Sequence, residues 1–190
     1  MGVTRHLDGE GPLASVGDPG TALSGAFDQD APASRWTLGI ALCLDQATDP
    51  AVLTGTIRGT RTIGDGFVFL GAYIRQFVPA QGDTPIGGVE GFPPNVSEPL
   101  RDLKGYPVSN PCQKPGSVDR NVPYTELLIG WGRSSGKDGG GWLGLDVNYT
   151  VDGRQYILAI AYSILICGPA VPARYCAEPS KPSGAPTPTP

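Results

Sequence analysis

The sequence has only one histidine, His6, and its charged side chains make up 17% of the residues, against about 25% in an ordinary soluble domain. The 14 basic residues are scattered singly along the chain, and the formal net charge is −4. Binding to a phosphate backbone depends on clustered Lys and Arg side chains. We therefore expect no nucleic-acid partner.

The scarcity of histidine also excludes whole classes of active site. A hydrolase of the Ser-His-Asp or Cys-His kind needs a histidine base, and His6 lies near the start of the chain, outside any periodic segment. Carboxylates such as Asp45, Glu90, Glu126 and Asp146 show no pattern that singles out a glycosidase pair. A zinc site needs four closely arranged Cys or His ligands, and the sequence has no C-x-x-C pair. We predict that the protein is not an enzyme and binds no metal and no cofactor.

Long apolar runs are missing as well. The longest, residues 156–167, is shorter than the roughly 20 residues that a membrane-spanning helix requires. The first twenty residues lack the apolar core of a signal peptide. We expect neither a transmembrane segment nor an export signal within this chain.

Four cysteines are present, Cys43, Cys112, Cys167 and Cys176. An even number in a chain of secretion-like composition is typical of disulfide-bonded proteins from an oxidising compartment. Two pairings are open: Cys43–Cys112 with Cys167–Cys176, or Cys43–Cys167 with Cys112–Cys176. Either one predicts an extracytoplasmic protein, secreted or at the cell surface, whose export signal is absent from this chain. Four free thiols would instead place it in the cytosol.

Glycine and proline divide the chain into three parts. The sequence has 28 Gly and 20 Pro. Residues 1–35 are rich in Gly, Asp, Ala and Pro without sustained periodicity, which predicts a disordered, flexible arm. Residues 171–190 form a Pro/Thr-rich segment, which predicts an extended tail. Residues 36–170 are expected to fold as one domain.

The central part alternates apolar and polar residues with period two, the pattern of half-buried strands. It does so in residues 36–44, 51–59 and 67–78. Residues 79–123 are irregular and rich in proline. A structureless loop of that length is unusual inside a domain, so we expect short turns or an edge strand there, held down through Cys112.

The clearest local prediction is a β-hairpin near the end of the domain. Asp152-Gly153 is a favoured pair for a two-residue type I′ turn. It joins two alternating segments, and the turn fixes their register so that Leu145 faces Ile160 and Leu143 faces Tyr162.

A glycine-rich stretch, GWGRSSGKDGGGWLG at residues 130–144, invites comparison with a phosphate-binding loop. That loop needs G-x-x-x-x-G-K-[ST] followed by a helix. Here Trp131 stands where the first glycine belongs, Asp138 follows Lys137, and a strand pattern comes next. We predict instead a hairpin connection between a strand at residues 124–131 and the strand that begins at Trp142.

One surface could bind a ligand. The alternation places Trp142 on the polar face of its strand with Asp146 and Asn148. An exposed aromatic ring beside polar side chains is typical of a sugar-binding surface. The alternative is that Trp142 is covered and has a structural role.

The order of these signals resembles that of a family of domains. The resemblance rests on five features in this order: LCLD at residues 42–45, AVLTGTIRG at residues 51–59, an aromatic-rich strand, a long Pro-rich loop with one cysteine, and ILICGP at residues 164–169. Together they resemble uncharacterised Ig-like β-sandwich ectodomains of actinobacterial exported or membrane-anchored proteins. The 10 Arg to 4 Lys suit such a host. The resemblance covers residues 36–168, implies no catalytic residues, and departs from those proteins in lacking their membrane anchor.

The sequence therefore predicts an all-β protein with a single antiparallel β-sandwich, Ig-like, of six to eight strands. We expect a non-enzymatic, extracytoplasmic interaction or structural domain with a protein or glycan partner. The alternative is a carbohydrate-binding module that uses exposed aromatics near Trp142.

Overall fold

The structure of the protein is a computed structural model, which describes residues 2–16, 23–27, 35–45, 49–113, 119–134 and 138–176, with residues 23–27 described by their backbone alone. The described residues are mostly β-strand, with two short 3-10 helices at Pro79–Gln81 and Ala173–Tyr175. The predicted tail falls largely on residues 177–190, which lie outside the described residues.

The strands form two sheets, which we call A and B. Sheet A has the order β1-β11-β10-β5-β8, with β3 also paired to β11, and sheet B has the order β2-β4-β9-β6, with β7 also paired to β4. The strands of sheet A are β1 (Val3–Leu7), β3 (Leu23–Phe27), β5 (Ala51–Gly64), β8 (Pro107–Val108), β10 (Gly140–Val151) and β11 (Arg154–Ile166). Those of sheet B are β2 (Leu13–Ser15), β4 (Arg35–Leu44), β6 (Phe67–Phe77), β7 (Gly88–Glu90) and β9 (Tyr124–Arg133).

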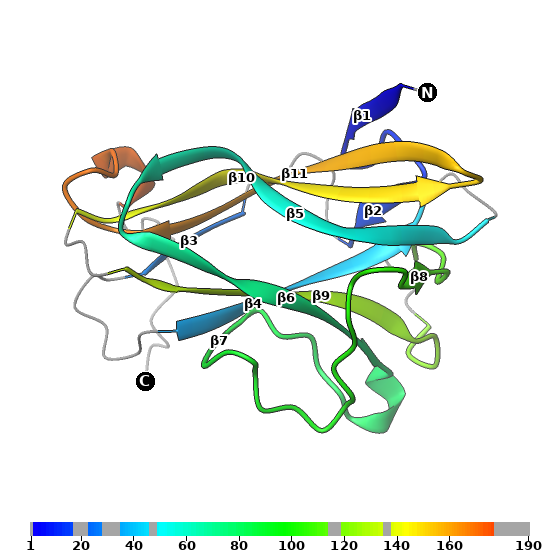
Figure 1. Ribbon diagram of the computed structural model, residues 1–190. Helices are drawn as coiled ribbons and strands as arrows, with labels where there is room; N and C mark the ends of the chain where they lie inside the picture. Colours follow the sequence, from blue (N-terminus) through cyan, green and yellow to red (C-terminus); the bar gives the residue numbers. More distant parts are fainter. Residues whose placement is uncertain are drawn as a thin grey trace, which may run out of the picture.

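The two sheets lie face to face in a sandwich-like arrangement, with β5, β10 and β11 in one layer and β4, β6 and β9 in the other (Figure 1). A single apolar core fills the space between them, because each alternating strand turns its apolar residues toward the other sheet. The core residues of β4 are those that the alternation predicts: Trp36, Leu38, Ile40, Leu42 and Leu44. The all-β prediction is confirmed.

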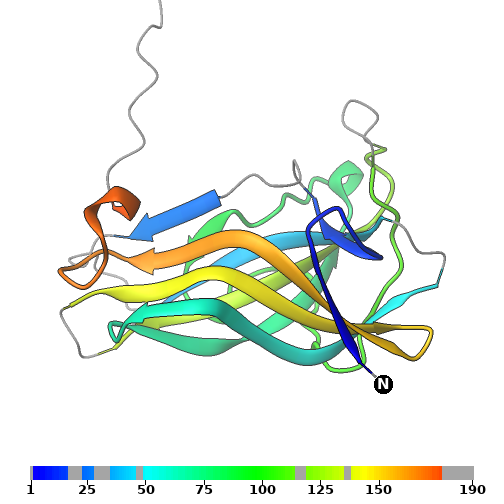
Figure 2. The same ribbon diagram turned by 90° about the horizontal axis from the view of Figure 1, so that it is seen from above.

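The strand count predicted for residues 36–170 is confirmed, since the described residues there form eight strands, β4 to β11, that pair with one another antiparallel. The prediction for the residues before them was wrong in part, because β1, β2 and β3 lie there, and β1 and β3 run parallel to β11. Figure 2 shows these two strands beside β11, at opposite ends of it. Residues 1–35 are therefore not simply a flexible arm: β1, β2 and β3 add to the sheets, while residues 1, 17–22 and 28–34 lie outside the described part.

In addition to its backbone pairing with β11, strand β1 is attached by polar side chains and not by an apolar face. Arg5 donates a hydrogen bond to Asp146 of β10 at 3.0 Å. The Nδ1 of His6 donates to the carbonyl of Leu7 at 2.8 Å, so in the neutral ring its Nε2 accepts from the hydroxyl of Tyr149 at 2.5 Å. Burial raises the pKa of Tyr149, which keeps this phenol protonated as the donor. The strand is thus anchored to the core without period-two alternation.

The hairpin of β10 and β11 is confirmed. Asp152 and Gly153 have φ of 47° and 69°, as a type I′ turn requires, and Leu145 lies opposite Ile160. Beyond that pair the predicted register was wrong, because of a β-bulge at Gly144, whose φ is 81°. Two residues of β11 lie opposite this one residue of β10, so that Leu143 faces Ser163.

The glycine-rich stretch is not a hairpin loop. Strand β9 pairs with β4 and β6 in sheet B, whereas β10 pairs with β5 and β11 in sheet A. The chain therefore crosses from one sheet to the other before β10. Glycines let backbone segments approach one another closely there. The N–H of Gly66 donates to the carbonyl of Gly139 at 3.0 Å, and a Cβ on Gly139 would lie 2.5 Å from the carbonyl oxygen of Ile166.

The irregular segment after β6, residues 78–113, covers the outer face of sheet B, and we call it the covering segment (Figure 1). It contains the short strands β7 and β8, as expected. The ring of Phe92 stacks on Tyr73 of β6, with 5.6 Å between centroids, and lies against Gly130 of β9, where an added Cβ would overlap it. Both faces of β9 are consequently buried, although a two-layer sandwich would leave one of them in water.

Candidate functional site

Both pairs of cysteines form disulfides, Cys43–Cys112 and Cys167–Cys176. This is the first of the two pairings that the sequence left open. The bond from Cys43 joins β4 to the covering segment, 69 residues away in sequence. Two intact disulfides are typical of a protein from an oxidising environment.

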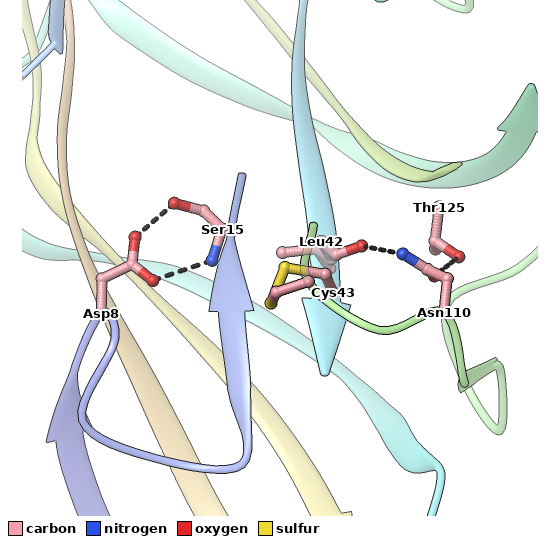
Figure 3. The surroundings of a disulfide bond; sticks show 7 residues. Asp8, Ser15, Leu42, Cys43, Asn110 and Thr125 are labelled. Carbon is pink, nitrogen blue, oxygen red and sulfur yellow. Dashed lines mark hydrogen bonds between the residues drawn. A yellow bond between two sulfur atoms is a disulfide. The ribbon is translucent and has the colours of Figure 1, made fainter. Parts of the chain in front are cut away.

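A buried asparagine reinforces the same junction. The Nδ2 of Asn110 donates to the carbonyl of Leu42 at 2.9 Å, and its Oδ1 accepts from the hydroxyl of Thr125 at 2.7 Å. Figure 3 shows these bonds beside the Cys43 disulfide, with a second pair of residues, Asp8 and Ser15, on the other side.

A buried ion pair fastens the covering segment to the middle of sheet B. The Nε of Arg75 on β6 lies 2.6 Å from Oε2 of Glu126 on β9, and both side chains are almost fully buried. Arg75 also pairs with Glu98 at 3.1 Å and donates to the carbonyl of Thr84 at 2.6 Å. The other oxygen of Glu126 accepts from the backbone N–H of Ile86 at 2.7 Å. Burial raises the pKa of Glu126, and the hydrogen bond and charge of Arg75 offset that shift only in part.

The edges of the two sheets each have a break in their pairing. On β4, β2 pairs with residues 42–44 and β7 with residues 36–38, so residues 39–41 have no strand partner on that side among the described residues. The carbonyl of Ala41 accepts one hydrogen bond there, from the N–H of Val16 at 2.8 Å. On β11, β1 pairs with residues 155–159 and β3 with residues 162–166, which leaves residues 160–161 between them. A cleft opens where these two breaks meet.

This cleft, which we call the β4-edge cleft, has a volume of about 610 Å³. That volume lies within the range of small-molecule sites, roughly 300–1,000 Å³. Its lining comes from both sheets and from the covering segment, and is mainly apolar, with Ile40, Phe77, Ile86, Tyr124, Ile160 and Tyr162 as its larger side chains.

Few polar groups line the cleft. Asp8 and Ser15 lie on the β1–β2 side, and Glu126 lies next to Ile86. Asp8 accepts hydrogen bonds from Ser15, one from its backbone N–H at 2.8 Å and one from its hydroxyl. Burial raises the pKa of Tyr162, so this phenol stays uncharged at neutral pH. An apolar cleft with a few fixed polar groups is the usual form of a ligand site.

The ligand surface predicted from the sequence is divided between two faces. Trp142 is only 8% exposed and belongs to the core, where its ring lies 5.1 Å from that of Phe67. The bulge at Gly144 is the reason, because it turns Trp142 to the same side as Leu145. The prediction that Trp142 shares the polar face was wrong.

Asp146 and Asn148 do lie on the outer face of sheet A, but their polar groups are engaged. Asp146 is 4% exposed and contacts Arg5, Arg58 and Thr60 at 3.0, 3.6 and 3.0 Å. The amide of Asn148 donates to the carbonyl of Thr56 at 3.3 Å. The structure thus gives Asp146 a role in holding β1 and β5 together.

An aromatic ring next to Trp142 is nevertheless exposed. Phe69 of β6 is 38% exposed, its ring lies 5.1 Å from that of Trp142, and it lines a groove of about 310 Å³. The groove runs between β5 and β6, and its polar residues are Thr54, Thr56, Asp102 and Lys104.

Sequence reasoning missed the β4-edge cleft, although two signals pointed toward it. Arg75 and Glu126 are charged residues within mainly apolar strands, and a buried charge is retained when it is paired. The positions of Asp8 and Ser15 carried no signal, because the strands that flank them are too short to show a period.

Neither a protein-family model nor a curated protein matches this chain. Within the described ranges no helix has the length and apolar character needed to cross a membrane. In the same part of the chain, no group of three or more His, Cys, Asp or Glu side chains could hold a metal ion.

Proposed function

We propose that this protein is a non-enzymatic, extracytoplasmic interaction domain and that the β4-edge cleft is its ligand site. The observation that carries this proposal is the cleft itself, about 610 Å³ in volume and mainly apolar in lining. The residues around it are fixed by the Arg75–Glu126 ion pair and by the Cys43–Cys112 disulfide. A preorganised apolar cavity of this size binds ligand without the cost of ordering its walls.

The disulfides and the arrangement of the sheets support the location and the family in this proposal. Two disulfides are common in exported proteins and rare in the cytosol. The two facing sheets agree with an Ig-like assignment for residues 36–168, and we retain the resemblance to actinobacterial ectodomains as part of the proposal. Alkylation of the protein in the cells that produce it, followed by intact-mass measurement, tests the location. Alkylated cysteines before reduction would contradict it.

The cleft can be tested with an uncharged fluorescent probe for apolar sites, Nile red. We expect saturable binding at one site per molecule. Gly87 lines the cleft, and an added Cβ there would meet nothing within 4 Å, so Gly87→Trp should fill the cleft without disturbing the fold and abolish binding.

Gly88 is the matched control for that experiment. It is equally open to an added side chain but does not line the cleft. Gly88→Trp should therefore leave probe binding unchanged. Equal binding by the two variants, or the absence of saturable binding to the unmodified protein, would refute the cleft as the ligand site.

A second candidate function, glycan binding, is favoured by the groove at Phe69. An exposed aromatic face beside hydroxyl, carboxylate and ammonium groups offers both stacking and hydrogen bonds to a saccharide. Since Phe69 lies 5.1 Å from Trp142, an oligosaccharide bound there should change tryptophan emission. Phe69→Leu should remove the effect, and Val68→Ala, at a neighbouring exposed position, should not. No change with any of a panel of soluble oligosaccharides would refute this candidate.

A further inference from the structure

The β4-edge cleft is lined by two carboxylates, Asp8 and Glu126, and by no Lys, Arg or His side chain among the described residues. The charge of Glu126 is already matched by Arg75, whose Nε lies 2.6 Å from its Oε2. Asp8, by contrast, has no ion-pair partner within the part of the chain that the structure describes. Arg75 is shared with Glu98, which lies 3.1 Å from it, and Asp8 is the one carboxylate of the described lining that has no cationic partner.

Hydrogen bonds orient the carboxylate of Asp8 without using all of its capacity to accept further bonds. Both of its oxygens accept a hydrogen bond from Ser15, one from the backbone N–H and one from the hydroxyl (Figure 3). Each oxygen of a carboxylate can accept a second bond. The group is thus oriented by the β1–β2 turn and keeps acceptor capacity for a ligand.

The remaining lining is favourable to a cation with an apolar body. The rings of Phe77 and Tyr124 stack with 5.3 Å between centroids, and Tyr162 adds a third ring that is uncharged at neutral pH. The guanidinium of Arg75 already lies over the ring of Phe77, 5.0 Å from its centroid, so these rings provide the surface for the apolar body, and Asp8 is the group that selects a cationic head group. An anionic head group would be repelled by the carboxylate of Asp8, because no cationic side chain among the described residues lines the cleft to offset that repulsion.

The break in the pairing of β4 is too short to accept an added strand from another peptide. Residues 39–41 of β4 span only about 10 Å, and β2 and β7 occupy the edge at both ends. An extended peptide cannot pair along β4 without displacing one of them. The space fits one small molecule.

We propose, building on the proposed function, that the β4-edge cleft binds a small amphiphile whose apolar body lies against Phe77, Tyr124 and Tyr162 and whose single cationic head group pairs with Asp8. The ligand class is thus a monocationic amphiphile, such as an alkylammonium compound. Fatty-acid anions are rejected by the same charge.

The test compares three probes that share a ten-carbon chain and differ in head group: decyltrimethylammonium, decan-1-ol and decanoate, all below the concentration at which they aggregate. Each competes with Nile red for the full-length protein. We expect the ammonium compound to bind most tightly, the alcohol next and the carboxylate least. Added salt should weaken the ammonium compound alone, because only its binding includes a partly exposed charge pair.

Asp8→Asn should lower the affinity for decyltrimethylammonium at least about fivefold, the smallest effect of an ion pair near 4 Å, and leave decan-1-ol unchanged. Glu10→Gln, in the same turn and outside the cleft lining, is the control and should change neither. If Asp8→Asn fails to fold, the salt dependence of the unmodified protein still decides the question.

The outcomes separate this inference from the function on which it rests. Equal affinities for the three probes, or tightest binding of decanoate, would overturn the cationic ligand class while the cleft remained a binding site. If neither Nile red nor any of the three probes binds, both proposals fall.

Discussion

The guanidinium of Arg75 and the carboxylate of Glu126 form an ion pair, 2.6 Å from Nε to Oε2, in which the two side chains are 3% and 1% exposed. Arg75 comes from the edge strand of sheet B and Glu126 from the strand beside it. The ion pair faces outward from the sandwich and is buried only because the segment after β6 covers it. It thus connects the sheet, the covering segment and the β4-edge cleft.

Removal of the cation should be strongly destabilising. Arg75→Met leaves Glu126 buried without its partner, and breaking a buried pair costs about 3–5 kcal/mol in the free energy of unfolding. Denaturant unfolding measures this loss, with Arg101→Met, an exposed arginine, as the control that should change little. Adding Glu126→Gln to Arg75→Met should recover part of the loss, since the unpaired charge is then gone. A double variant no more stable than Arg75→Met would contradict this account.

The raised pKa of Glu126 predicts a pH dependence of defined sign. At a pH between the ordinary pKa of 4.5 and the higher pKa of the folded state, Glu126 has released its proton in the unfolded protein and still holds it in the folded protein. The unfolded state then binds fewer protons, so the contribution of Glu126 to the free energy of unfolding falls as pH rises through this window.

The measurement is the free energy of unfolding of the unmodified protein minus that of Glu126→Gln, from about pH 4 to about pH 8. Carboxylates common to both proteins cancel in this difference. We expect the difference to be greatest at the acid end and to decline above 4.5. A difference that rises with pH would show that Arg75 lowers the pKa by more than burial raises it.

The alternation of side chains predicted which residues of β4, β5, β6, β9 and β10 form strands, but not the sheet to which each strand belongs. Period two fixes the inward face of a strand and carries no information on its neighbours. The segment before Trp142 was for this reason predicted to be a hairpin connection, although it crosses between the sheets. The side chain of Trp142 itself was misplaced because one bulge at Gly144 reverses the parity of everything before it.

The N-terminal strands could not be predicted from the sequence for a different reason. Strand β1 has five residues, mostly exposed, and its attachment depends on single contacts such as that of His6 with Tyr149, distant by more than a hundred residues in sequence. Such contacts leave no periodic pattern. The cleft shares this property, since its polar groups come from β1–β2, β9 and the covering segment and meet only in the folded protein.

The two disulfides should differ in their contribution to stability. In the chain-entropy model a crosslink stabilises more when it closes a longer loop. Sequence separations of 69 and 9 residues then correspond to about 4 and about 2.5 kcal/mol. We expect Cys43→Ser/Cys112→Ser to lose more stability than Cys167→Ser/Cys176→Ser in denaturant unfolding without reductant. The reverse order would show that the covering segment stays docked without its disulfide.

The absence of a side chain at Gly39 should be essential to the β4-edge cleft. An added Cβ at this position would overlap the carbonyl oxygen of Ile86 and Oε1 of Glu126. That carboxylate oxygen accepts the hydrogen bond from the N–H of Ile86 that attaches the covering segment to sheet B. Gly39→Ala must therefore push that segment outward, and overpacking of this kind costs about 1–3 kcal/mol. We expect lower stability in denaturant unfolding together with weaker binding of Nile red.

Gly87 separates this steric effect from a general intolerance of alanine. It lines the same cleft, but an added Cβ would meet nothing within 4 Å, so Gly87→Ala should be neutral in both measurements. If Gly39→Ala loses stability but binds Nile red unchanged, the covering segment moves without changing the shape of the cleft. Loss of both, in Gly39→Ala alone, would show that the contact of Ile86 with Glu126 sets the shape of the ligand site.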